Sequence, residues 1–121
     1  MPDYLSVGEI PEAECISIAL YLEAEELITL GEQLNAICDE AYMNGENWNA
    51  VLTAYLEQNA PELLEELEPD PEAGMYAAAY PLTEENRIKA KQLAECIVSL
   101  VSDPQTLCDF VAAHAEEIEW D

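Results

Sequence analysis

The side chains most able to do chemistry in this sequence are its carboxylates. The segment ELLEELEPDPEAG, residues 62–74, has six acids in thirteen positions and no base, and the sequence ends in the acidic run EEIEWD. Pro69 and Pro71 stiffen the first segment, so its acids are held on a fixed loop rather than a floppy tail. Like charges held together cost free energy unless a cationic partner offsets the repulsion. This pattern predicts a docking surface for a basic protein.

The predicted partner-binding residues are the acids of this loop and of the terminal run, together with one tryptophan. They are Glu65, Glu66, Glu68, Asp70, Glu72, Glu116, Glu117, Glu119, Trp120 and Asp121. A tryptophan among carboxylates can anchor a partner while the acids pair with its bases. The alternative for Trp120 is that it covers the core, and both interpretations stay open at this point.

Metal binding and catalysis have weaker signals. The acids of residues 68–72 alternate as in a calcium loop, but Ala79 stands where the bidentate glutamate belongs, so calcium binding is kept only as a second alternative. His114 is the single histidine, and a place on an apolar helical stripe predicts that it is partly buried. No base lies near a cysteine in the sequence to lower the pKa of its thiol. We therefore expect no enzyme activity, no cofactor and no metal ligands.

Composition narrows the classes of partner. The 121 residues include 27 acids against three bases, a formal net charge of −24, which repels nucleic acid and anionic membranes.

Half of the residues are hydrophobic, which is enough for one folded domain over residues 1–121. The N-terminus MPDYLSVGE lacks the pattern of a secretory signal, and no apolar run reaches about 18 residues. These features predict a cytoplasmic protein whose cysteines 15, 38, 96 and 108 are buried thiols, with two disulfides as the alternative.

Hydrophobic periodicity predicts a mixed fold. Alternation over residues 14–22 and the string MYAAAY at 75–80 indicate strands, residues 4–11 can add another, and Ile118 and Trp120 allow a short terminal strand. Pro69 and Pro71 are expected to prevent regular structure between the strands. With the helices below, this predicts an α+β fold: a small antiparallel sheet of two or three strands with about four helices packed on it. An all-α bundle is the alternative.

Four segments have helical spacing. The first runs from Glu23 to about Met43, and the second follows Asn47 as N-cap and buries a stripe from Trp48 to Leu56. Pro61 opens a short turn. Thr83 caps the third helix, whose predicted buried side includes Ile88, and Asp103-Pro104 starts the fourth.

The three bases, Arg87, Lys89 and Lys91, all lie on the third predicted helix. We expect them to join that helix to acids of a neighbouring element, a structural role. The remaining surface is then even more uniformly anionic.

Three strings carry a resemblance to a known class of proteins. MNGENWNAVLTAYLEQNAPELLEEL, DPEAGMYAAAY and the terminal IEW resemble immunity proteins of bacterial polymorphic-toxin systems, which use contact-dependent, Rhs or type VI secretion routes. The resemblance implies a partner protein that binds and neutralises a cognate toxin domain. Many such toxins are nucleases with basic clefts, which an acidic protein could fill. The runner-up is a nucleic-acid mimic that blocks a defence enzyme, as anti-restriction and anti-CRISPR proteins do.

Overall fold

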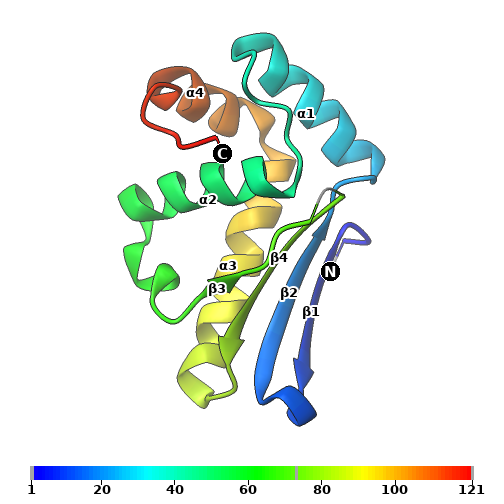
Figure 1. The fold of residues 1–121 in the computed structure, drawn as a ribbon, viewed down its shortest axis with the longest axis vertical. Helices are drawn as coiled ribbons and strands as arrows, with labels where there is room; N and C mark the ends of the chain where they lie inside the picture. Colours follow the sequence, from blue (N-terminus) through cyan, green and yellow to red (C-terminus); the bar gives the residue numbers. More distant parts are fainter. Residues whose placement is uncertain (1, 73, 121) are drawn as a thin grey trace.

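The computed structural model describes residues 2–72 and 74–120, and this part of the chain has an α+β architecture (Figure 1). Its strands are β1 (Leu5–Ile10), β2 (Cys15–Tyr21), β3 (Glu68–Pro69) and β4 (Met75–Pro81). Its α-helices are α1 (Glu25–Ile37), α2 (Gly45–Asn59), α3 (Glu84–Ser102) and α4 (Pro104–His114). Two short 3-10 turns, η1 (Pro11–Ala13) and η2 (Pro61–Leu64), complete these elements.

The strands form one antiparallel sheet in the order β1-β2-β4-β3. Because side chains alternate along a strand, β2 and β4 bury one face and leave the other half-exposed. The helices cover the buried face (Figure 1), and its side chains join the core through Ile16, Ile18, Leu20, Tyr76, Ala78 and Tyr80. The predicted α+β class is confirmed and the all-α alternative is wrong, while the sheet has four strands rather than two or three.

The additional strand, β3, contains one of the prolines that were expected to prevent regular structure. Pro69 pairs with Ala78 of β4, and the N–H of Asp70 donates to Ala77 O at 2.7 Å. Proline has no N–H for a second neighbour, so it is tolerated on an edge strand such as this one. The expectation of irregular structure at Pro69 is therefore wrong.

The first helix is shorter than predicted. Helix α1 ends at Ile37 rather than near Met43. The side-chain amide of Asn35 donates to Ala41 O at 3.3 Å, which holds the following chain back against the helix. Ala41 and Met43 are still buried, as the apolar spacing suggested, but they lie in the connection to α2.

The starts of the other helices test three cap predictions. Asn44, and not Asn47, caps α2, because its Oδ1 accepts from the Asn47 N–H at 2.8 Å. Thr83 caps α3 as predicted, and Pro104 begins α4 as predicted. Ile88, which was predicted to be buried, is 61% exposed.

The chain after α4 forms no strand within the described residues. The predicted terminal strand at Ile118 and Trp120 is wrong, because this segment is irregular. Both side chains are nevertheless buried in the core, so the alternating pattern reflects burial without sheet pairing.

Two of the three bases take the expected structural role. Arg87 Nε lies 3.1 Å from Glu9 of β1, and Lys89 Nζ lies 3.8 Å from Glu65. Lys89 is only 7% exposed, so its charge contributes little to the surface. Within residues 2–72 and 74–120, Lys91 has no ion pair.

No single helix of the described segments is long and apolar enough to cross a membrane. Helices α3 and α4 pass that test of length and composition only as a pair, which is bent by 93°.

Candidate functional site

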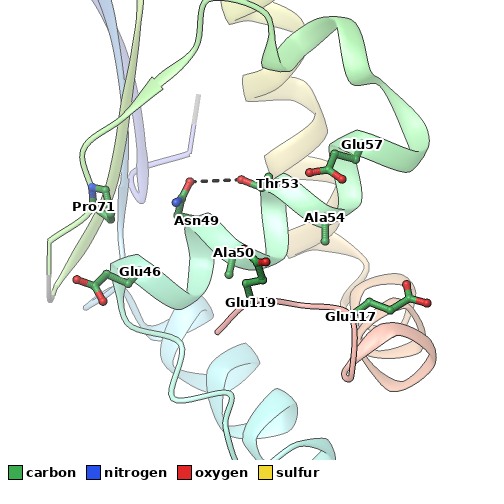
Figure 2. A pocket seen from close by; sticks show the side chains of 9 residues that line it. All are labelled: Glu46, Asn49, Ala50, Thr53, Ala54, Glu57, Pro71, Glu117 and Glu119. Carbon is green, nitrogen blue, oxygen red and sulfur yellow. Dashed lines mark hydrogen bonds between the residues drawn. The ribbon is translucent and has the colours of Figure 1, made fainter. Parts of the chain in front are cut away.

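Two acidic parts of the chain meet beside α2: the acidic loop, residues 62–72, and the C-terminal segment, residues 115–120. They border a cleft of about 550 Å³, to which the loop contributes Pro71 and the C-terminal segment contributes Glu117 and Glu119. Figure 2 shows the carboxylates of Glu46, Glu57, Glu117 and Glu119 around this space. We call these four residues and the surface between them the acidic cleft.

One face of α2 forms the floor of the acidic cleft. Glu46 lies in its first turn and Glu57 in its last, with Asn49, Ala50, Thr53 and Ala54 between them. Residues spaced by three or four share a helix face, which places these six side chains in one stripe (Figure 2). The floor is therefore small and uncharged, with acids at both ends. Such a surface admits a long cationic side chain and offers it carboxylate acceptors.

His114 holds one wall of the cleft. Its Nδ1 lies 2.9 Å from Glu117 Oε2, and its ring packs at a tilt of 34° against Phe110, with centroids 4.5 Å apart. The side-chain amide of Gln58 also lies 3.3 Å from this Nδ1, so which partner it bonds depends on the tautomer: protonated, it donates to Glu117, and unprotonated, it accepts from Gln58. Glu117 is thus oriented from α4, and the prediction of a partly buried histidine near a helix end is confirmed.

Asn47 holds the other end of the C-terminal segment. Its Nδ2 donates to Trp120 O at 2.7 Å and its Oδ1 accepts from the Met43 N–H at 2.9 Å. The indole of Trp120 donates to Ala115 O at 3.2 Å, and its side chain is only 6% exposed. The burial fits the interpretation that Trp120 covers the core. Its backbone fixes Glu119 beside α2, so Trp120 serves the cleft indirectly.

The other predicted contact acids are dispersed. Asp70 and Glu72 are exposed on either side of Pro71, and Glu68 is exposed on β3. Glu65 lies toward Lys89, and Glu66 has a left-handed backbone with φ 67°. Glu116 is exposed after α4, and Asp121 lies outside the described residues. Of the ten predicted residues, the lining of the cleft includes Glu117 and Glu119.

Two acids of the cleft, Glu46 and Glu57, were not among the predicted site residues. Each is a solvent-facing acid on an amphipathic helix, which is the most ordinary place for a glutamate. The sequence did contain a pattern that could have identified them. Both lie on the same helical stripe as Ala50 and Ala54, opposite the apolar stripe of α2. The stripe is uncharged between these two acids, which is unusual on the outer side of a helix in so acidic a chain.

The cysteines have the features of structural thiols, and the described acids form no metal site. All four cysteines are free and half-buried rather than fully buried. Burial raises the pKa of the Cys96 thiol, and burial with nearby Asp109 raises that of Cys108, which weakens both as nucleophiles. Among the described residues, no three His, Cys, Asp or Glu side chains could together hold a metal ion. The calcium alternative gains no support from this geometry.

Comparison with known families places the chain in one of them. The family model described as Immunity protein 51 matches residues 9–116, which is most of the chain and includes β2, β3, β4 and the four α-helices in full, with the last two residues of β1. The chain belongs to this family of immunity proteins, as the sequence resemblance implied. Neither a curated protein nor a solved structure matches it.

Proposed function

We propose that this member of the Immunity protein 51 family neutralises its toxin by placing the acidic cleft against a cationic surface of the toxin domain. Family membership supports a toxin partner. The cleft supports a basic one, because it collects carboxylates from α2 and the C-terminal segment around an uncharged floor. This convergence is the observation that carries the proposal.

The charge of the whole chain favours the same kind of partner. Two of the three bases lie beside acids, so little positive charge is free to repel a cationic protein. A net charge of −24 steers a basic protein toward the chain and raises its association rate by about 10- to 1,000-fold. The same field repels nucleic acid.

We further propose that the toxin is a nuclease and that inhibition requires no catalysis by this chain. A nuclease holds phosphates with arginine and lysine side chains, and these match the carboxylates of the cleft. Occupying them excludes the substrate by charge and by bulk. The protein would act in the cytoplasm, where the nucleic acid substrate of such a toxin is found.

A protection assay tests the proposal. The test uses the toxin domain that is expected in a neighbouring gene. It is expressed in cells with the wild-type chain or with a variant that carries Glu46→Gln, Glu57→Gln, Glu117→Gln and Glu119→Gln. Loss of the carboxylates should weaken binding by about 100-fold or more and abolish protection. Survival equal to that with the wild type would contradict a role for the cleft.

The matched control neutralises four other exposed acids, Glu12, Glu14, Glu84 and Glu85. Glu12 lies in η1, Glu14 directly follows it, and Glu84 and Glu85 begin α3. In Figure 1, η1 and the start of α3 lie at the lower end of the molecule, below α2. The control changes the net charge by the same amount, so it should retain protection. Equal loss in both variants would indicate that total charge matters and position does not.

A further inference from the structure

We infer that the toxin also inserts an apolar side chain into a second surface, a groove of about 360 Å³ beside α1. This inference rests on the proposed function and adds a second contact to it. The groove is lined by Leu22, Leu27, Ile28, Gly31, Tyr42 and Met43, with Glu32 and Asn35 at its border. We call it the α1 groove.

Exposed apolar side chains gather around this groove. Tyr42 is 77% exposed and Ile28 is 52% exposed, and both line it. Below them, Leu27 and Met43 are buried and form an apolar floor. An aromatic and an aliphatic rim over an apolar floor, with polar residues outside, is the composition of an interface centre. In so highly charged a chain, leaving these side chains in water calls for an explanation.

The groove is held open by Gly31. This residue lies inside α1, where glycine costs about 1 kcal/mol relative to alanine. A Cβ there would meet Met43 Cβ at 3.4 Å, an ordinary contact, so packing does not exclude alanine. The missing side chain gives no gain to the fold, but it keeps the floor of the groove accessible.

The floor of the groove is also fixed in place. Met43 has a left-handed backbone with φ 55°, and its N–H donates to Oδ1 of the buried Asn47 at 2.9 Å. The groove therefore exists before a partner arrives, which lowers the entropy lost on binding. Asn47 also binds the C-terminal segment of the acidic cleft, so one residue positions parts of both surfaces.

Charge complementarity identifies the occupant. Glu32 lies at the groove, and Asp39 and Glu40 are exposed just before Tyr42, while every base in the chain is on α3. A second copy would bring another net charge of −24 against this surface, which opposes self-association. An apolar side chain flanked by arginine or lysine on the toxin fits both the groove and its border.

Binding of the inactivated toxin domain that is expected in a neighbouring gene tests the inference. Tyr42→Ala and Ile28→Ala should each weaken binding by about tenfold or more. Ile88→Ala is the matched control, because Ile88 is a similarly exposed helical isoleucine on α3, and it should bind as the wild type does. Gly31→Ala should weaken binding while leaving the stability unchanged or raised, a combination that a folding defect does not produce.

The possible failures are distinguishable. If the wild-type chain does not bind this toxin domain, the proposed function is wrong and the inference falls with it. If the wild type binds and the groove variants bind equally well, only the inference is wrong. A wild-type dimer in sedimentation that Tyr42→Ala makes monomeric would assign the groove to a second copy and overturn the inference.

Discussion

Asn47 joins three separate parts of the chain through one buried side chain. It lies in the first turn of α2, accepts from Met43 and donates to Trp120. Neither bond could be foreseen from the sequence, where the position suggested a helix cap. The cap is Asn44 instead, which leaves the amide of Asn47 free to bond outside the helix.

Replacing Asn47 should therefore destabilise the fold more than an ordinary helix substitution. Asn47→Ala leaves the Met43 N–H and the Trp120 carbonyl without their partner, and we expect a loss of about 2–4 kcal/mol. Urea unfolding measures it, with Asn49→Ala as the control, since Asn49 is half-buried two residues along the same helix. Equal losses in both variants would contradict this role for Asn47.

Tyr80 makes the fold sensitive to alkaline pH. Burial raises the pKa of Tyr80 to about 12, and its hydroxyl donates to Leu63 O. The ordinary pKa of tyrosine is about 10, so the stabilisation is complete below pH ~10 and is lost as the pH rises toward ~12.

The expected loss over that interval from Tyr80 is about 2–3 kcal/mol. Unfolding by urea at several pH values between about 9 and about 12 should show a smaller decline for Tyr80→Phe than for the wild type. Parallel declines would show that Tyr80 does not contribute to this dependence.

At the scale of elements, the start of α2 packs unusually closely against the turn between β3 and β4. A Cβ at Gly45 would collide with the backbone carbonyl oxygens of Glu72 and Met75. This contact sets the position of α2 relative to the sheet, and with it the place of the acidic cleft beside Pro71.

Gly45→Ala should consequently cost about 3 kcal/mol, since backbone atoms on both sides must shift. Gly8→Ala provides the control, because a Cβ on Gly8 of β1 meets nothing within 4 Å. We expect Gly8→Ala to be neutral or stabilising by up to about 1 kcal/mol. Thermal unfolding of the two variants compares them directly, and similar melting temperatures would count against close packing at Gly45.

Some of these elements could be predicted from the sequence and others could not. Alternation in residues 14–22 and the string MYAAAY at 75–80 predicted β2 and β4, and each of these strands buries one face. The sequence did not predict β3, a two-residue edge strand that includes Pro69, and it wrongly suggested a strand at Ile118 and Trp120. For the cleft, acid density indicated the C-terminal segment. Glu46 and Glu57 could be assigned to the cleft only from the structure, in which α2 lies beside the C-terminal segment.

At the scale of the whole molecule, charge should limit stability as well as direct binding. The acids repel one another in the folded chain, and salt screens that repulsion over about 10 Å or less. Raising NaCl from about 0.05 M to about 0.5 M should therefore increase the free energy of unfolding by roughly 1 kcal/mol or more. Urea unfolding measures this effect, and a stability that falls with salt would contradict it.

The rate at which the toxin domain associates with the wild-type chain tests the central claim most directly. Stopped-flow measurements from about 50 mM to about 1 M salt report the part of that rate due to long-range attraction. If the surplus negative charge of this chain serves to draw in a cationic toxin, the association rate constant falls by about tenfold or more across that range. An association rate constant that is the same at both ends of the range would contradict the account.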